Sequence, residues 1–261
     1  MTDQIGPSMP PKAALGASPK KVKPIYKDIV ELILNSNRTV AEKLRELGKC
    51  LVCSSSELPE LKQYRDNVLE AIRAYYKGDY NRALRFAMGV VKILRAKYET
   101  SDIPKLILEI AYPRGYWDEI TAASEKHGNK DPYLISAMIR QESRYKAKAR
   151  SGKGATGLMQ VRYDTARPIC DRLKLSCKLY EPAQVIEVGT SYILEQIKKF
   201  GDEQKALAAY NGGPGNARKW QSHCRSGNFV QDCVKFPETQ EYINEVLESR
   251  NMYRELYSDK D

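Results

Sequence analysis

The chain has 261 residues, enough for two domains and a sizeable core. Lysine and arginine outnumber aspartate and glutamate by 43 to 33, and the resulting formal charge of +10 favours a polyanionic partner. The basic residues are spread along nearly every predicted helix with acids between them, so we expect no nucleic-acid partner. We also expect no membrane span, because no apolar run approaches the roughly 18 residues required.

The first part of the chain predicts a tail followed by a helical accessory domain. Residues 1–24 are rich in Pro, Lys, Ser and Ala, which is typical of a disordered tail or a cloning remnant. They include no apolar signal segment, so an exported protein of this sequence would be a mature form. Residues 25–101 carry apolar stripes of helical spacing, with Gly78 as a C-cap and Asp79 as an N-cap between the last two. This hairpin is similar to a tetratricopeptide pair, but no second copy follows, so a solenoid is not expected.

The cysteines number six and fall into close pairs along the chain, which favours disulfides and an oxidising compartment. Spacing alone leaves their connectivity open. The Cys50 and Cys53 spacing also fits a redox or metal site, but His127 and His223 are the only histidines, so we expect no metal. A protein with free thiols is the remaining alternative. The other cysteines are Cys170, Cys177, Cys224 and Cys233.

The rest of the chain, residues 102–261, predicts a second domain that is helical throughout. Asp131 and Pro132 predict a helix start, with Asp131 as N-cap and Pro132 at the first helical position. No stretch alternates like a strand, although a short β-ribbon near residues 153–161 stays open. We therefore predict an all-α fold. The other expected helices cover residues 103–110, 116–125, 163–173, 181–200, 203–210 and 238–257.

The clearest chemical signal is Glu142. Ile135, Met138 and Ile139 recur at helical spacing, and one further turn of the same stripe reaches Glu142. Burial on an apolar face disfavours the charged carboxylate, so the pKa of Glu142 should be raised and the side chain could act as a general acid. The alternative is a solvated carboxylate that pairs with Arg140 or Arg144.

Three polar, turn-rich segments follow in the chain. A Ser- and Gly-bearing turn, residues 151–157, leads to Gln160 and can place it beside Glu142. A second segment, AYNGGPG, puts Tyr210 and Asn211 at another turn. The third, FPETQEY, opens the last helix with Glu238 and contains Tyr242. Each segment alone is explained by a turn or a helix start.

Taken in order, QES, GLMQ, AYNGGPG and PET with its following Tyr resemble the catalytic domain of the soluble lytic transglycosylases. The resemblance covers roughly residues 112–257. It implies a goose-lysozyme-like catalytic domain preceded by a helical accessory domain, through which a protein partner could bind. It also implies export to the periplasm, with peptidoglycan glycan strands and stem peptides as partners.

The resemblance implies a reaction without metal or cofactor. Glu142 would protonate the oxygen that leaves N-acetylmuramic acid and then take a proton from the C6 hydroxyl, which closes a 1,6-anhydro ring. The acetamido group of the sugar would replace a second carboxylate. Carried over by position, Ser151, Gly157 and Gln160 are expected to contact sugar or stem peptide. Tyr210 and Asn211 are expected to orient the acid or the acetamide, Glu238 to contact peptide or amine, and Tyr242 to line the site.

Several alternatives stay open at this point. Asp164 and Glu238 are candidate second carboxylates, although capping explains Glu238. Tyr210 could be buried packing and Asn211 a helix C-cap. A goose-type muramidase would hydrolyse the same bond with water, and a non-catalytic wall-binding protein would act through its helical domain. After GLMQ the resemblance predicts an apolar residue followed by Met and Pro. This chain has Val161, Arg162 and Tyr163 instead, which leaves the contacts at that position open.

Overall fold

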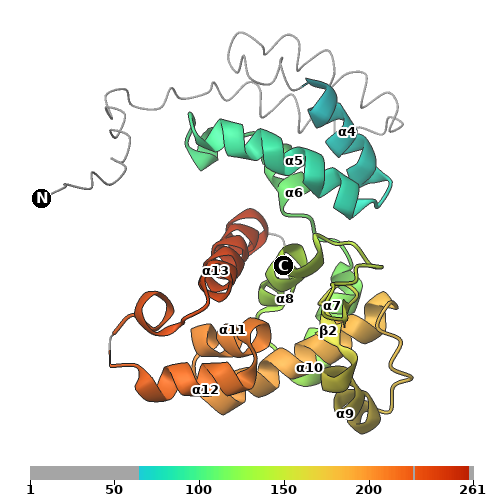
Figure 1. Cartoon of the computed structure of the whole chain (residues 1–261). Helices are drawn as coiled ribbons and strands as arrows, with labels where there is room; N and C mark the ends of the chain where they lie inside the picture. Colours follow the sequence, from blue (N-terminus) through green and yellow to red (C-terminus); the bar gives the residue numbers. More distant parts are fainter. Residues whose placement is uncertain (1–64, 226, 259–261) are drawn as a thin grey trace, which may run out of the picture.

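The computed structural model describes residues 65–225 and 227–258. The predicted tail, the first apolar stripes of the accessory domain, and Cys50 with Cys53 lie outside these ranges. Within them the chain is helical apart from one small antiparallel ribbon of β1 (Ala155–Thr156) and β2 (Val161–Arg162), which confirms the all-α prediction (Figure 1). In this ribbon Ala155 pairs with Arg162 and Thr156 with Val161. No described helix combines the length and the apolar character needed to cross a membrane.

Ten α-helices carry the fold of the described residues (Figure 1). They are α4 (Arg65–Tyr76), α5 (Tyr80–Arg95), α6 (Lys105–Ala111), α7 (Trp117–His127), α8 (Pro132–Ser143), α9 (Tyr163–Leu173), α10 (Pro182–Phe200), α11 (Glu203–Gly212), α12 (Pro214–His223) and α13 (Pro237–Tyr257). Two shorter turns are η2 (Thr100–Asp102) and η3 (Phe229–Cys233).

The helical hairpin predicted around Gly78 consists of α4 and α5. Gly78 has a φ of +74°, and the Asp79 carboxylate accepts a hydrogen bond of 3.0 Å from the Arg82 N–H, so both predicted caps are present. The apolar stripe of α5, which includes Leu84 and Leu94, is buried. Helix α6 packs on α4 and α5 and also contacts α13, which joins this hairpin to the rest of the molecule (Figure 1).

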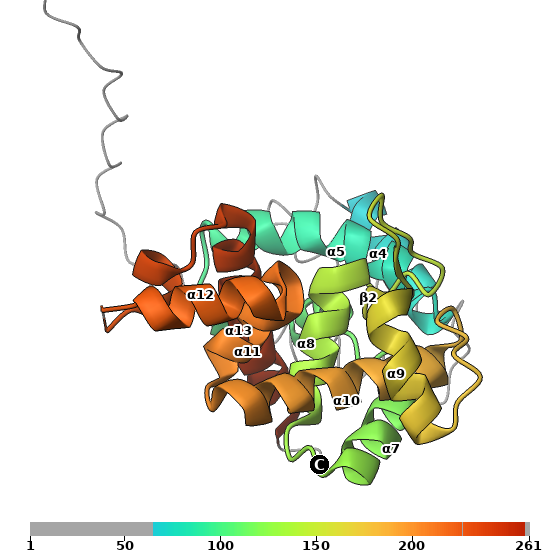
Figure 2. The same ribbon diagram turned by 60° about the horizontal axis from the view of Figure 1, so that its bottom comes forward.

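Helix α8 forms the centre of the fold and lies among α7, α10, α11 and α13 (Figure 2). Every residue from Tyr133 to Arg140 is buried, including all three members of the predicted stripe. Its largest packing partner is α13, while α10 packs on α7 and α11. Burial of each large aliphatic side chain stabilises the fold by about 1.5–3 kcal/mol, so this helix has little freedom to move.

The segment between α6 and α7 is fixed by hydrogen bonds from α13 and from the end of α8. The Tyr145 hydroxyl donates to the Pro113 carbonyl over 2.8 Å, and the Tyr253 hydroxyl lies 2.8 Å from that of Tyr145. Arg140 donates from Nε to the Ala111 carbonyl over 3.0 Å. The Pro113 carbonyl also accepts a hydrogen bond of 3.2 Å from Tyr253, so two phenols share it, whereas loss of Arg140 would remove the side-chain donor of the Ala111 carbonyl.

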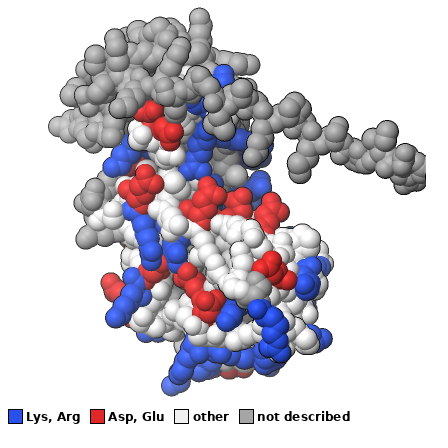
Figure 3. Space-filling view, turned by 90° about the vertical axis from the view of Figure 1, so that its left-hand side faces the viewer, with Lys and Arg blue, Asp and Glu red and all other residues white. Residues whose placement is uncertain are grey.

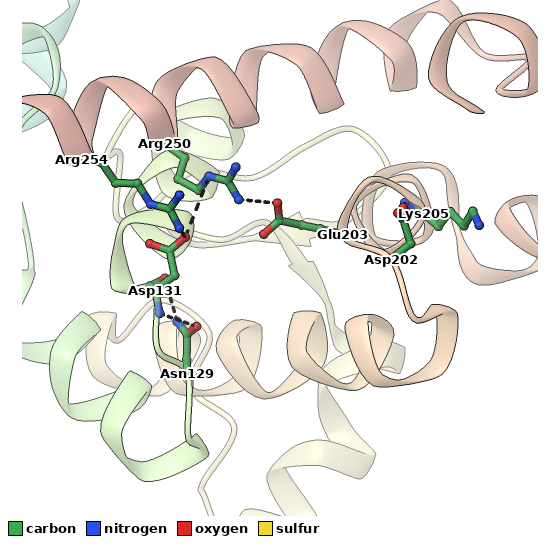
Figure 4. Close-up of polar contacts among 7 residues, drawn as sticks. All are labelled: Asn129, Asp131, Asp202, Glu203, Lys205, Arg250 and Arg254. Atoms are coloured by element: carbon green, nitrogen blue, oxygen red, sulfur yellow. Dashed lines mark hydrogen bonds and ion pairs between the residues drawn. The ribbon is translucent and has the colours of Figure 1, made fainter. Parts of the chain in front are cut away.

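Asp131 has a different partner from the one predicted. It precedes α8 as expected, with Pro132 at the first helical position, but its side chain makes no capping hydrogen bond. The carboxylate instead accepts a hydrogen bond of 2.7 Å from Arg254 and lies 3.9 Å from Nε of Arg250 (Figure 4). Asp131 thus occupies the predicted N-cap position, but its carboxylate pairs with two guanidinium groups and not with a backbone N–H of α8.

Arg250 connects three helices through its charges. It extends from α13 toward Asp131 before α8 and also donates to Glu203 at the start of α11 (Figure 4). The Arg250 side chain is only 16% exposed, so these pairs are less screened than surface pairs.

Elsewhere, acidic and basic side chains are interspersed on the face shown in Figure 3, and lysines and arginines gather along its lower edge.

The helix boundaries differ from the sequence prediction around the AYNGGPG segment. Helix α11 continues to Gly212, and a helix that was not predicted, α12, begins directly at Pro214. Gly213 joins the two with a φ of +87°, a value that side chains disfavour. The glycines therefore form a sharp corner between two helices rather than a loop.

Two disulfides join cysteines that are neighbours along the chain, Cys170 with Cys177 and Cys224 with Cys233. The first closes the end of α9 onto the following loop, and the second joins the end of α12 to η3.

We expect removal of either disulfide to destabilise the fold by about 2 kcal/mol, because each closes a short loop in the unfolded chain. The variants are Cys170→Ser with Cys177→Ser, and Cys224→Ser with Cys233→Ser. Denaturant unfolding of each pair variant, with and without reductant, measures the effect. A wild-type unfolding curve that reductant leaves unchanged would contradict the pairing.

We expect Arg250→Met to lower the free energy of unfolding by about 2 kcal/mol, because it leaves Asp131 and Glu203 without a shared cation in a poorly solvated position. Arg254→Met is the matched control, since the Arg254 side chain is 49% exposed and its loss should cost about 0.5 kcal/mol. Equal losses in the two variants, measured by urea unfolding, would show that Arg250 does not connect the helices.

Candidate active site

One cavity of about 820 Å³ brings together side chains from the end of α8, the β1–β2 ribbon, α10, the corner between α11 and α12, and the start of α13. Its lining contains most of the residues singled out in the sequence, although they are far apart along the chain. Those present are Glu142, Ser151, Gln160, Tyr210, Asn211, Glu238 and Tyr242.

Glu142 lies one residue before the end of α8, and its side chain faces the cavity. Protein surrounds it on its other sides, and this burial raises the pKa of Glu142 to about 8. The neighbouring Tyr242 hydroxyl acts in the opposite direction, while the negative charge of Glu238 adds to the rise. The carboxyl is therefore mostly protonated at neutral pH.

The alternative in which Glu142 pairs with an arginine is not observed. Arg140 points the other way and donates to the Ala111 carbonyl and to the Ser249 hydroxyl. The Arg144 side chain is exposed, and its backbone has the left-handed conformation, with a φ of +50°, at the C-cap of α8. Because the chain turns away directly after Glu142, the carboxyl stays at the cavity wall without a neighbouring cation from its own helix.

Two phenols accompany Glu142 in the cavity, Tyr242, which is buried, and Tyr210, which is partly buried. Tyr210 donates from its hydroxyl to the Met159 carbonyl over 2.8 Å, and its ring lies 5.2 Å from that of Tyr192 on α10. Tyr242 is 4% exposed, and its hydroxyl makes no hydrogen bond of standard length within the described residues. Burial raises the pKa of both phenols well above the ordinary value, so both remain neutral donors.

Asn211 is held by a side chain from α13. Its carbonyl oxygen accepts a hydrogen bond of 2.6 Å from the Thr239 hydroxyl, which leaves the two amide N–H groups available on the cavity side. It is not a helix C-cap, because α11 continues to Gly212 and ends on Gly213. The amide is thus oriented as a donor toward whatever occupies the cavity.

The ribbon turn supplies a second wall. Gln160 has a φ of +48° and donates from its side chain to the Gly157 carbonyl over 2.8 Å, while Ser151 accepts from the Ala155 N–H. Gly157 is not part of the lining. Its φ is +76°, and an added Cβ would lie 2.0 Å from the Leu179 carbonyl oxygen. Gly157 therefore allows the ribbon turn to pack closely against Leu179, while Ser151 and Gln160 present polar atoms to the cavity.

Of the other lining residues, only those of the Val161–Arg162 segment were singled out in the sequence, as a departure from the motif. Tyr192 comes from the middle of α10, and Glu241 from the first turns of α13. Lys153 and Arg162 come from the ribbon and its turn, and Thr165 from the start of α9. A charged residue in a turn is normally solvated, so only the folded arrangement indicates that these side chains face a cavity.

Comparison with known proteins finds a similarity to one family over part of the chain. Residues 119–231 match the model of the Transglycosylase SLT domain. Soluble lytic murein transglycosylases of Salmonella typhimurium and Escherichia coli K12 are 32% and 31% identical over 164 and 163 residues, 59% of this chain and 25% of each relative. A transglycosylase of Enterobacteria phage PRD1 is 34% identical over 111 residues, 42% of this chain and 39% of that protein. The aligned region thus spans a quarter of the length of the two murein transglycosylases.

Solved structures show the same fold. The 70 kDa soluble lytic transglycosylase of E. coli superimposes with a TM-score of 0.63 at 22% identity, covering 94% of this chain and 38% of that one. An inactive mutant of lytic transglycosylase Slt from Pseudomonas aeruginosa gives 0.61 at 23% identity, covering 95% and 39%. The resemblance stated from the motifs is therefore confirmed.

We expect the raised pKa of Glu142 to make folding stability depend on pH. Below about pH 4.5 both the folded and the unfolded chain hold the proton. Between the ordinary pKa of 4.5 and the folded value of about 8 only the unfolded chain loses it, so the folded state loses stability as pH rises through this window and none beyond it. Relative to wild type, the free energy of unfolding of Glu142→Gln should rise by about 1.4 kcal/mol for each pH unit within the window.

Urea unfolding at several pH values between 4 and 9 measures this difference, with Glu241→Gln as a control for removing an exposed carboxyl from the same cavity. A constant stability difference between Glu142→Gln and wild type at all pH values would show that Glu142 ionises normally.

Proposed function

We propose that this chain, whose residues 119–231 form an SLT domain, is a peptidoglycan lytic transglycosylase. It would cleave the bond between N-acetylmuramic acid and N-acetylglucosamine and leave a 1,6-anhydro ring on the muramic acid. The observation that carries this proposal is a single half-buried carboxyl, Glu142, which lies at the wall of an open cavity and whose pKa is raised to about 8. The relatives named as murein transglycosylases support the substrate class.

In the first step Glu142 acts as the acid. Bond cleavage requires a proton on the bridging oxygen while C1 of the sugar becomes oxocarbenium-like. A carboxyl with a pKa of about 8 holds its proton at neutral pH and can donate it to a substrate oxygen beside it as the glycosidic bond breaks. The cavity wall would hold that oxygen against the carboxyl.

In the second step the same residue acts as the base. After proton donation, Glu142 is a carboxylate in a poorly solvated position, and the neutral Tyr242 hydroxyl beside it can donate to it. The carboxylate then takes the proton of the C6 hydroxyl, whose oxygen attacks C1 of the same sugar. An internal nucleophile can have an effective concentration on the order of 10⁵ M or more, which favours ring closure over attack by water.

A second catalytic carboxylate is not needed on this route. The Asp164 side chain is 85% exposed, pairs with Arg162 and is not part of the cavity lining. Glu238 lines the cavity but lies in the first turn of α13, and its charge raises the pKa of Glu142. We assign the stabilisation of C1 to the acetamido group of the sugar, which the Asn211 amide N–H groups are placed to orient.

The remaining contacts follow from the same geometry. Gln160 and Ser151 would contact sugar or peptide from the ribbon wall, and Glu238 would meet an amine of the stem peptide. Tyr210 would hold the ribbon against α11 through its bond to Met159. An exported location fits the two disulfides, which persist in oxidising compartments.

We expect Glu142→Gln to lower turnover at least about 10³-fold, because the amide can neither donate nor take up the proton. The measurement is mass spectrometry of muropeptides released from purified sacculi, in which wild type should give 1,6-anhydro ends. Glu241→Gln is the matched control and should retain most activity. Reducing ends from wild type would identify a hydrolytic muramidase, and comparable activity in Glu142→Gln would remove Glu142 from the mechanism.

A further inference from the structure

The cavity has two cationic side chains whose role the proposed reaction leaves open. Lys153 lies in the turn that precedes β1, and Arg162 is the second residue of β2. Both line the cavity. The ribbon and α13 lie on opposite sides of α8 in two views of the molecule (Figures 1 and 2). The cations therefore form part of the wall that faces the start of α13.

The two cations are poorly neutralised within the protein. Arg162 has one acidic neighbour, Asp164, at 3.5 Å, and the two side chains are 58% and 85% exposed, so the pair is weak and open to competition. Lys153 makes no ion pair within the described residues. Glu142 does not compensate them, since its pKa is governed by burial, Tyr242 and Glu238. An anion in the cavity could thus pair with two cations that the protein itself neutralises only weakly.

The acidic lining comes from the other side. Glu238 and Glu241 both belong to the start of α13, so the cavity presents acids from one wall and cations from the opposite one. A ligand with only neutral sugar hydroxyls would use neither charge. A glycan that carries charged substituents would be oriented by both, because reversing it would place like charges together.

The backbone keeps Arg162 in this position. Val161 is 3% exposed and fills the apolar position that the motif predicts, so the chain keeps its register and Arg162 stands where a methionine is expected. The pairing of Arg162 with Ala155 then fixes the residue on the ribbon. An arginine here adds a planar group with several donors that can bind a carboxylate through two hydrogen bonds.

We propose that Lys153 and Arg162 bind a carboxylate carried by the 3-O substituent of the muramic acid, and thereby make this chain prefer substrates in which that carboxylate is free. This inference rests on the proposed function and names the determinant of its substrate preference. The carboxylate has two sources, the stem peptide or the lactyl group of a glycan from which the peptide has been removed.

The test compares three substrates and four proteins. The substrates are peptide-bearing glycan chains, the same chains with their carboxyls converted to amides, and chains stripped of peptide by an amidase. The proteins are wild type, Arg162→Met, Arg162→Met with Lys153→Met, and Arg167→Met. Arg167 is exposed on α9 outside the cavity lining, so its loss removes the same charge without changing the proposed contact.

Wild type and Arg167→Met should cleave free-carboxylate chains about tenfold more efficiently than amidated ones, as kcat/KM. The double variant should lose this preference, mainly through a higher KM on the free-carboxylate chains, while its activity on amidated chains stays near wild type. Stripped chains should behave like amidated ones if the stem peptide supplies the carboxylate, and like free-carboxylate chains if the lactyl group does.

An unchanged preference in the double variant, or an equal loss in Arg167→Met, would overturn the inference and leave the proposed function intact. Wild type that cleaves none of the three substrates would overturn the proposed function instead. Equilibrium binding of free and amidated glycopeptide fragments to the same four proteins then tests the cationic pair separately, and equal affinities would overturn it.

Discussion

Withdrawal of the Glu142 carboxyl from water is the constraint on which the rest of the site depends. A carboxyl group in water is ionised at neutral pH, and only the surrounding protein raises its pKa enough to keep it protonated. Burial raises the pKa to about 8, and the neighbouring acid Glu238 adds to the rise. The Tyr242 phenol opposes it, so the carboxyl can both hold and release a proton.

Keeping a carboxyl away from water lowers the stability of the fold, and packing and polar contacts between the surrounding helices offset this loss. The residues of α8 that precede Glu142 are buried almost without interruption and pack on α13. Arg250 ties α13 to the starts of α8 and α11, while Tyr145 and Tyr253 hold the Pro113 carbonyl. The side chains of the cavity therefore come from segments that cannot shift independently, which is the condition for a preorganised site.

The division of charge in the cavity is a separate property from the acidity of Glu142. The proposed proton chemistry uses Glu142 at the end of α8 and the neighbouring Tyr242, whereas Lys153 and Arg162 occupy the ribbon wall. A chain can therefore change what its ribbon binds without disturbing the acid. Arg162 follows Val161, whose pairing with Thr156 fixes the strand, so under the proposed recognition this one residue would change binding while the fold stays the same.

The sequence by itself determined the helical fold, the position of Glu142 on an apolar face and, through the resemblance of its motifs, most of the segments that form the cavity. Periodicity and caps are local properties, so they are readable without the fold. Only the tertiary structure decided how deeply Glu142 is buried, that Asp131 pairs with arginines rather than capping α8, and that Gly157 packs rather than lines the cavity. Each of these depends on which distant segment covers a side chain, and a local pattern of residues contains no information about that contact.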